Sequence, residues 1–265
     1  MVLLRQNDTG ERVVELQQLL NLAINANLSL TGIYGPLTRA AVLNFQRTNN
    51  LVADGIVGPI TWAALNKRTV EVAPERNFYI IAGHDLVRDP GAVNHALNLT
   101  EAREAVSLRD SITQKLQPLG ATVINDNDSW NLAKTINKII SKVKPNDILI
   151  DIHFNAATPA ARGVEAFVSD PCTQTENEIA HQLCAITNDV LGIPIRQNWT
   201  PSLLPGVKYE TATRHKRLGI LRPNCQNILW EVCFISNDIE IKNYLNLRDV
   251  LATKVANYLN SIKNK

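Results

Sequence analysis

The chain has 265 residues, of which 45% are hydrophobic and 20% are charged. This length fits a catalytic-sized domain plus a small one, and the composition excludes a disordered, collagen-like or coiled-coil chain. Lys and Arg number 27 against 25 Asp and Glu, and the net charge of +2 argues against a nucleic-acid partner. We expect no membrane partner either, because no segment reaches the roughly 18 apolar residues of a membrane span.

The N-terminal segment and the cysteines bear on where the protein is made. The chain does not start with a basic stretch followed by a long apolar one, so we expect no secretion signal. The cysteines at 172, 184, 225 and 233 form no C-x-x-C pair and are predicted to stay reduced. Cys184 or Cys233 could serve as a nucleophile, but a buried thiol is the favoured interpretation for both. We therefore expect a protein that is synthesised in the cytoplasm. We also expect it to be a monomer.

Two matching segments occur within the first seventy residues. Thr31–Val42 and Asp54–Leu65 are offset by 23 residues and are identical at seven of twelve positions. Each contains a Gly-Pro step, which predicts helices that begin at Pro36 and Pro59, because proline suits the first helical turn. Apolar residues at helical spacing over 13–24 predict a helix before them. These patterns indicate a small three-helix domain.

The repeated pattern is also that of a known domain. Gly10, Leu16-Gln17 and the two segments fit its motif, although Thr31 stands where Asp is usual. They resemble the peptidoglycan-binding domain of a family of cell-wall hydrolases, and the resemblance implies peptidoglycan as a partner. A three-helix module without a ligand would use the same turns. A helix-turn-helix that binds DNA is disfavoured because the module's charge is only +2.

The rest of the chain predicts a second, larger domain. The three-helix domain covers 1–68, a polar linker covers 69–77, and the second domain covers 78–265. Within it, strand-like runs at 78–82, 121–124, 147–152, 164–168 and 227–234 alternate with helical patterns near 100–118, 130–143, 175–191 and 238–262. This alternation predicts an α/β fold with a central, mainly parallel twisted sheet flanked by helices.

Two histidines stand at the ends of predicted strands. His84 follows the run 80–83, and His153 lies near the end of the run 148–155. The carboxyl ends of parallel strands meet at one edge of a sheet, where sites collect. Period-two alternation places His153 on the same face as Asp151 and Asn155. We therefore expect the two imidazoles to meet. His95, His181 and His215 are predicted to be ordinary surface or hydrogen-bonded histidines.

Two carboxylates are candidate partners of these histidines. Glu101 stands in the first turn of a predicted helix, where Asn98-x-x-Glu101 would equally form a capping box. Glu231 lies in the apolar run 228–234, where a carboxylate is costly unless it is paired or used. Burial would raise its pKa toward that of a working acid or base. A structural carboxylate that orients a neighbour is the alternative for Glu231.

These residue types suit a hydrolytic metal site. Two histidines and one glutamate leave an open fourth position on a tetrahedral Zn²⁺, which such a site needs for water. A nearby carboxylate can take the proton from water and return it to a leaving nitrogen. The four residues span 84 to 231 without a short metal motif, so their spacing alone does not bring them together.

Residues 78–262 share a set of motifs with one enzyme family. The motifs are Gly83-His84 with Asp89-Pro-Gly-Ala92, Glu101, Asp151-Ile-His153-Phe-Asn155-Ala156, Gly163-Val-Glu165, Leu218-Gly-Ile-Leu-Arg222 and Leu229-Trp-Glu231-Val-Cys-Phe234-Ile-Ser-Asn237. They resemble the zinc-dependent N-acetylmuramoyl-L-alanine amidases of the amidase-3 type. The resemblance implies that His84, Glu101 and His153 bind Zn²⁺ and that Glu231 is the catalytic carboxylate. It also assigns Asn155 and Arg222 to substrate binding.

The chain departs from this family's pattern at several positions. Ile81 stands in place of an Asp, Asp85 and Leu86 in place of two glycines, Asp151 in place of the Ser of Ser-x-His, and Cys233 in place of a Gly. None of these changes removes a predicted zinc ligand. Asp151 could orient His153 or merely replace a small hydroxyl.

Together the two resemblances imply a peptidoglycan hydrolase. Zinc-activated water would cleave the amide between N-acetylmuramic acid and the L-alanine of the stem peptide, and the N-terminal module would hold the enzyme on the wall. Without an export signal, a phage endolysin that reaches the wall after release and lyses the host is the expected role, with a bacterial autolysin or mother-cell lytic enzyme as alternatives. A zinc peptidase acting on the stem peptide and a non-catalytic wall-binding protein are the competing functions.

Overall fold

The computed structural model describes residues 3–24, 26–69, 76–197 and 200–264. The chain divides into two compact units, residues 1–74 and 75–265. Most of the predicted linker at 69–77 lies outside the described residues, so the linker stays a prediction.

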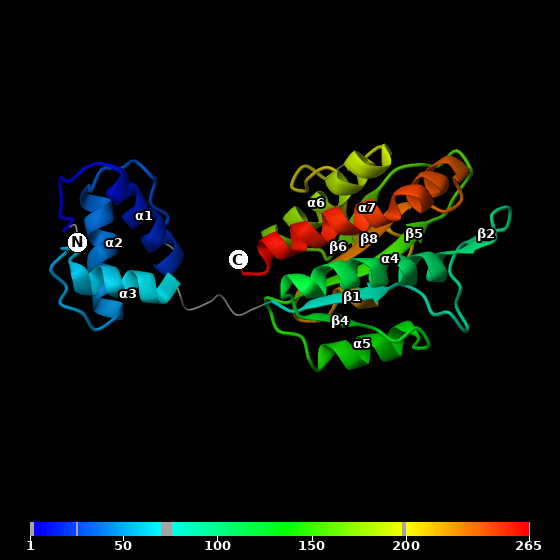
Figure 1. Ribbon diagram of the computed structural model, residues 1–265, viewed down its shortest axis with the longest axis horizontal. Helices are drawn as coiled ribbons and strands as arrows, with labels where there is room; N and C mark the ends of the chain where they lie inside the picture. Colours follow the sequence, from blue (N-terminus) through cyan, green and yellow to red (C-terminus); the bar gives the residue numbers. More distant parts are fainter. Residues whose placement is uncertain (1–2, 25, 70–75, 198–199, 265) are drawn as a thin grey trace. The chain divides into compact units, whose positions relative to one another are not determined.

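The N-terminal unit is a bundle of three helices, α1 (Glu11–Ile24), α2 (Pro36–Thr48) and α3 (Pro59–Thr69) (Figure 1). Both Gly-Pro steps begin helices, as the repeat predicts. The core gathers apolar side chains from all three helices and both turns, namely Leu4, Val13, Leu16, Leu20, Tyr34, Val42, Phe45, Val57, Trp62 and Leu65. The Tyr34 hydroxyl donates to the Gly55 carbonyl at 2.8 Å, which satisfies its polar group inside this core.

Two buried glutamines connect the helices to the repeated turns. The Oε1 of Gln46 accepts the Gly55 N–H at 2.9 Å, and its Nε2 donates to the carbonyl of the next residue at 2.9 Å. Gln17 makes the same pair of bonds in the first copy, at 3.1 Å to the Gly32 N–H and 3.1 Å to the following carbonyl. Both glycines have positive φ, +68° and +74°, which explains why each copy requires a glycine there. The sequence repeat is therefore also a structural repeat, in which a buried glutamine hydrogen-bonds to each turn.

The second unit is an α/β domain built on a six-stranded sheet with the strand order β4-β1-β5-β8-β6-β7. The strands are β1 (Phe78–Ala82), β4 (Val123–Asn125), β5 (Ile148–Asn155), β6 (Glu165–Val168), β7 (Val207–Tyr209) and β8 (Gln226–Phe234). All neighbours are parallel except β6 and β8, which confirms a mainly parallel sheet. β7 was not predicted, nor was the hairpin of β2 (Val93–Asn94) and β3 (Leu99–Thr100), because two or three residues are too few to show a period.

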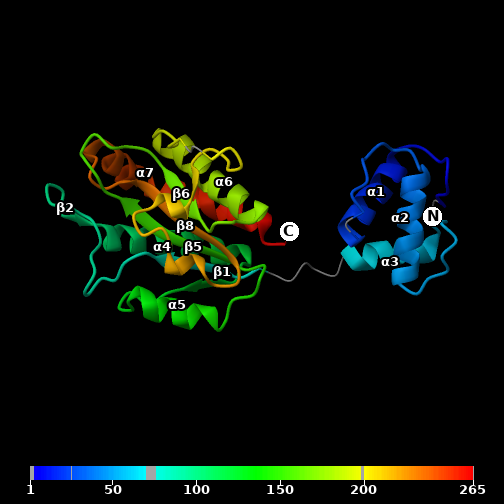
Figure 2. The same ribbon diagram turned by 180° about the vertical axis from the view of Figure 1, so that it is seen from behind.

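Helices cover both faces of the sheet (Figure 1). The helices α4 (Glu101–Leu116), α6 (Gln174–Leu191) and α7 (Asp238–Ile262) pack on one face, and α5 (Leu132–Ile140) with the short 3-10 helix η3 (Gly219–Leu221) packs on the other. Two further 3-10 turns are η1 (Gln117–Leu119) and η2 (Glu210–Ala212). Figure 2 shows the same layers from behind, with the hairpin of β2 projecting beyond them. In the described part of the chain, no helix is long and apolar enough to cross a membrane.

The helix α4 begins differently from the predicted capping box. Its N-cap is Thr100, whose side chain accepts the Arg103 N–H at 3.4 Å, whereas Asn98 has a φ of 53° and lies outside the helix. The capping-box interpretation of Glu101 is therefore wrong, because Glu101 is the first helical residue rather than the third. Its side chain is left for other partners.

Candidate active site

The three predicted zinc ligands and Glu231 meet at the edge of the sheet where β1, β5 and β8 end, which we call the rim. His84 directly follows Gly83 at the end of β1, and the Gly83 N–H continues the ladder to the Ile152 carbonyl at 3.0 Å. His153 lies near the end of β5 and pairs in register with Glu231 on β8. Glu101 reaches the same place from the start of α4. Parallel pairing thus brings together residues that the sequence separates by up to 147 positions, from 84 to 231.

His84, Glu101 and His153 form a group that could hold a metal ion. Their candidate ligand atoms all lie within 4.8 Å of one another. Glu101 Oε2 lies 3.3 Å from His84 Nε2, and Glu101 Oε1 lies 2.9 Å from His153 Nδ1. The two rings stand edge to face with their centroids 5.1 Å apart. Two imidazoles and a carboxylate that converge in this way match the donor set of a catalytic zinc site.

The backbone fixes the Glu101 carboxylate. Each of its oxygens also accepts one N–H, Oε2 from Ala92 at 2.9 Å and Oε1 from Phe154 at 3.0 Å. Burial by itself would raise the pKa of Glu101, but hydrogen bonds from His153 and His84 outweigh it and hold that pKa well below its usual value. Glu101 is therefore a preorganised anion between two rings.

Each histidine directs its other ring nitrogen at an aspartate. His84 Nδ1 lies 2.9 Å from Asp89 Oδ2, and His153 Nε2 lies 3.1 Å from Asp151 Oδ2. A carboxylate on one ring nitrogen fixes the orientation of the ring, so the other ring nitrogen faces Glu101. This contact with His153 favours the orienting role for Asp151 among the two roles that the sequence left open. The side chain of Asp89 is 63% exposed and that of Asp151 only 1%.

Two glycines make room for these side chains. A Cβ on Gly83 would lie 2.1 Å from His153 Nε2, and a Cβ on Gly91 would lie 2.7 Å from Glu101 Oε2. Gly91 also has a φ of +66°, which side chains rarely tolerate. Any other residue at these positions would displace a candidate ligand.

Glu231 is available for acid–base chemistry. Its Oε2 is buried and has no hydrogen-bond partner among the residues that the structure describes, and a structural carboxylate would normally have one. Desolvation raises the pKa of Glu231 to about 8, against an opposing effect of His153 and with a further increase from Glu101. These properties favour the catalytic interpretation over the structural one.

The two predicted substrate-binding residues lie in different places. Asn155 is at the rim, where its Nδ2 donates to Glu165 Oε1 at 2.7 Å. Arg222 forms an ion pair with Glu210, which follows β7. Because β6 and β7 run opposite to β8, Glu210 lies toward the edge of the sheet away from the rim. The structure does not bring Arg222 to the histidines, and its substrate contact stays a prediction.

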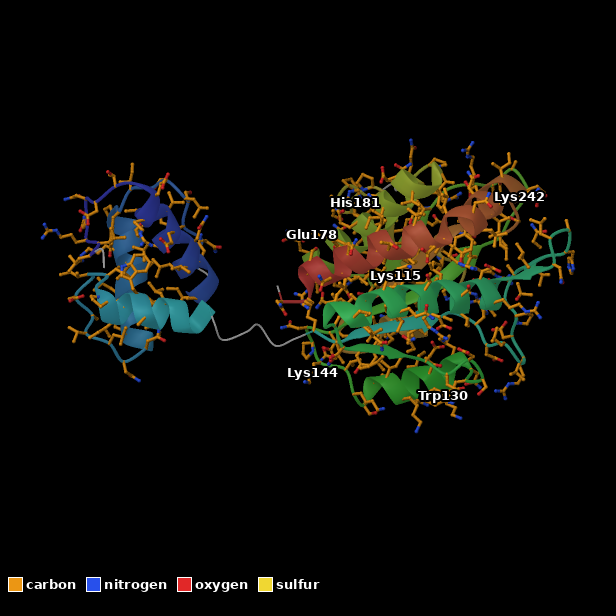
Figure 3. The ribbon with its side chains drawn as sticks, in the orientation of Figure 1. Lys115, Trp130, Lys144, Glu178, His181 and Lys242 are labelled. Carbon is orange, nitrogen blue, oxygen red and sulfur yellow. The ribbon has the colours of Figure 1, made fainter. Side chains whose placement is uncertain are left out.

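Sequence reasoning missed several charged residues around the site. Arg196 and Lys208 both form ion pairs with Glu165, and Arg109 forms one with Asp126 at 2.8 Å. They occur in segments without a recognisable motif, and only the chain crossings bring them to their partners. Residues for which the sequence predicted no catalytic role also lie as expected. Cys184 and Cys233 are buried, and desolvation is the main cause of their raised thiol pKa. His181 lies on the outer helix α6 (Figure 3).

Comparisons with known proteins agree with this architecture. The family model described as "N-acetylmuramoyl-L-alanine amidase" matches residues 79–264, and the one described as "Putative peptidoglycan binding domain" matches residues 9–65. A search of curated proteins gives no match. The chain therefore belongs to the N-acetylmuramoyl-L-alanine amidase family. It is a peptidoglycan amidase that also carries a peptidoglycan-binding domain.

Solved structures show the same fold. A "putative N-acetylmuramoyl-L-alanine amidase" from Neisseria meningitidis is 25% identical with a TM-score of 0.57, over 69% of this chain and 93% of that one. The catalytic domain of the amidase CwlV from Bacillus (Paenibacillus) polymyxa var. colistinus is 16% identical with a TM-score of 0.57, over 72% and 99%. The catalytic domain of the CD27L endolysin, which targets Clostridia difficile, is 18% identical with a TM-score of 0.54, over 72% and 98%.

Proposed function

We propose that this amidase is zinc-dependent and hydrolyses the amide between N-acetylmuramic acid and the L-alanine of the stem peptide. The observation that carries the proposal is the convergence of His84, Glu101 and His153 within 4.8 Å. Beside them lies a buried Glu231 oxygen that has no partner in the described part of the chain. Three ligands with an open position and a free carboxylate are the elements that metal-assisted hydrolysis of an amide needs.

The surroundings fit a metal ion. Both histidines are held by aspartates on their outer nitrogens, and both Glu101 oxygens are fixed by backbone N–H groups. The glycines at 83 and 91 leave the volume that the rings and the carboxylate occupy. His84, Glu101 and His153 would hold the ion, and the two-histidine, one-carboxylate donor set favours zinc. Zinc, when bound, supplies a Lewis acid that polarises the carbonyl and lowers the pKa of water.

The protein's own carboxylate handles the proton. Water adds to the amide carbon, the C–N bond breaks, and one proton must travel from the water to the leaving nitrogen. Glu231 can take that proton and return it, because its pKa of about 8 lies close to the working range. The products are the lactyl carboxylate of the sugar and the free amino group of L-alanine.

The bond that is cut tests this proposal against the zinc peptidase. Purified sacculi are digested with the zinc-loaded protein, and the new termini are identified by mass spectrometry after labelling of amino groups. We expect new L-alanine amino ends. Release of D-alanine, or new ends at a cross-bridge, would instead establish a peptidase.

Metal content separates the enzyme from a non-catalytic wall-binding protein. We expect one zinc per chain by elemental analysis, loss of hydrolysis with a chelator, and recovery when zinc is added back. A folded protein that binds sacculi but neither retains zinc nor cuts them would contradict the proposal.

For the biological role we propose an endolysin that degrades the host wall after release. The combination of an amidase domain with a peptidoglycan-binding domain supports a lytic role, because tethering raises the local concentration of the wall substrate. Expression together with a membrane-permeabilising protein should lyse the cell, and the Glu231→Gln variant should not. Lysis that is equally fast with this variant would contradict the role.

A further inference from the structure

A row of charged side chains crosses the sheet at the rim, starting from the metal group. His153 on β5 is in register with Glu231 on β8, and Glu231 is in register with Glu165 on β6. Residues in register on neighbouring strands lie on the same face, and neighbouring strands are about 4.8 Å apart. Glu165 therefore stands one strand beyond Glu231, on the side away from His153.

Glu165 gathers two cations at this end of the row. Arg196 Nε lies 2.9 Å from Glu165 Oε2, and Lys208 Nζ contacts the same oxygen. Asn155 donates to the other oxygen at 2.7 Å. The Glu165 side chain is 5% exposed, whereas Lys208 and Arg196 are 19% and 34% exposed. The cations thus line the accessible side of a buried carboxylate.

The single negative charge of Glu165 does not balance the two positive charges of Arg196 and Lys208. Two cations share one carboxylate, and across the described ranges neither cation forms an ion pair with a second one. The excess of one positive charge is partly buried, where an opposite charge is worth more than in bulk water. Arg196 is also held in place, because its Nη1 donates to the Arg162 carbonyl at 3.1 Å and its guanidinium lies over the Phe234 ring at 5.0 Å. A cation fixed in this way is preorganised to bind an anion.

We propose that Arg196 and Lys208, held by Glu165, form a subsite for a carboxylate on the peptide side of the substrate. This inference rests on the proposed function. On the sugar side of the cleaved amide the substrate is uncharged, because the lactyl carboxyl is itself part of the amide. On the peptide side, L-alanine is followed by D-glutamate linked through its γ-carboxyl, whose α-carboxyl is either free or amidated.

The dimensions agree with this assignment. Consecutive Cα atoms of a peptide are about 3.8 Å apart, so the α-carboxyl of the second residue lies roughly one to two residue lengths from the cleaved bond. One strand spacing from Glu231 leads to β6, and two lead to β7, which carries Lys208. The acidic stem peptide therefore runs over β6 and β7, and the enzyme prefers D-glutamate with a free α-carboxylate to its amide.

Two matched substrates test the subsite. They are N-acetylmuramoyl-L-alanyl-D-γ-glutamyl-L-lysine and the same compound with the glutamyl α-carboxyl amidated, each cleaved by the zinc-loaded full chain. We expect a KM about tenfold lower for the free acid with similar kcat, because a charged hydrogen bond away from the cleaved amide binds the ground state and the transition state alike. The preference should shrink as salt is added.

Variants connect the preference to these side chains. Lys208→Met and Arg196→Gln should each bring the KM ratio of the two substrates toward one, and Lys208→Arg should keep it. Lys115→Gln is the control, because Lys115 pairs with Asp249 on the outer helices (Figure 3).

Equal cleavage of both substrates by the wild type would overturn the subsite and leave the proposed function intact, whereas cleavage of neither would count against the proposed function. Equal losses on both substrates in Lys208→Met and Arg196→Gln would show a structural role and also overturn the subsite.

Discussion

Two glutamines of the N-terminal unit and two carboxylates at the rim of the second unit differ in how their buried polar atoms are bonded. In the N-terminal unit, Gln17 and Gln46 are 2% and 1% exposed, and both atoms of each amide are hydrogen-bonded to a turn. At the rim of the second unit, Asp151 Oδ1 and Glu231 Oε2 are buried and have no hydrogen-bond partner within the described ranges. Because an unsatisfied buried polar atom destabilises a fold, the first arrangement serves stability and the second is kept at a cost to stability.

The comparison separates two kinds of buried polar residue. Substitution of a satisfied glutamine should lower stability and leave the chemistry intact. Substitution of an unsatisfied rim carboxylate should abolish chemistry and leave stability intact or improve it.

The largest effect is expected for Glu231→Gln. The amide keeps the shape of the side chain but cannot take up a proton, so turnover on sacculi should fall by a factor of about 10²–10⁴. Zinc content should not change, because Glu231 is not among the three converging ligands. Release of new L-alanine amino ends measures the loss, and a variant that keeps most of its activity would remove Glu231 from the mechanism.

The two aspartates behind the histidines should differ in their effect on the metal. Asp151→Asn should weaken zinc binding by about 10–100-fold, because the buried carboxylate fixes the orientation of His153. Asp89→Asn should weaken it less, since the exposed Asp89 can be replaced by water. Competition with a chelator of known affinity measures both. Equal effects would show that burial does not decide the strength of this support.

The satisfied glutamines should affect stability alone. Gln46→Ala leaves the Gly55 N–H and the neighbouring carbonyl without their partner and should destabilise the N-terminal unit by about 1–3 kcal/mol. Gln17→Ala should act similarly on the first turn, and the exposed Gln18→Ala serves as the control. Hydrogen exchange at the Gly32 and Gly55 amides in the full chain measures the change. Cleavage of a soluble muropeptide should be unchanged, and a parallel loss of turnover would break the division.

The sequence predicted the elements that are long and periodic, and the residues whose chemistry is conspicuous in an apolar strand. Its five strand-like runs all correspond to strands, and His84, His153 and Glu231 meet because parallel strands end at one edge. The strand β7 was not predicted, because its three residues are too few to show the alternation of a strand. Lys208, which lies on β7, was also missed, because its role depends on the contact with Glu165, 43 residues away in the sequence.

Local patterns also misled where two explanations shared the same residues. Asn98-x-x-Glu101 satisfies the spacing of a capping box, but Thr100 takes the cap and leaves Glu101 to the histidines. The choice depends on the backbone at Asn98, whose φ of 53° is set by the hairpin before the helix. A window of four residues does not contain that information.

The pH dependence of stability has a sign that distinguishes the rim from the glutamine-closed turns. Below pH 4.5, the ordinary pKa of a glutamate, Glu231 is protonated in both the folded and the unfolded state. Between this value and its folded pKa of about 8, the unfolded state releases a proton that the folded state keeps. The free energy of unfolding of the metal-free protein should therefore fall as pH rises, by at most about 1.4 kcal/mol per pH unit from this residue.

Glu231→Gln cannot ionise, so its stability relative to the wild type should increase steadily from pH 5 to pH 8. The control is Glu178→Gln, an exposed position on α6, which should show no such trend (Figure 3). Urea unfolding in the presence of a chelator measures the difference, and parallel pH profiles for the wild type and Glu231→Gln would mean that the buried oxygen imposes no cost on the fold.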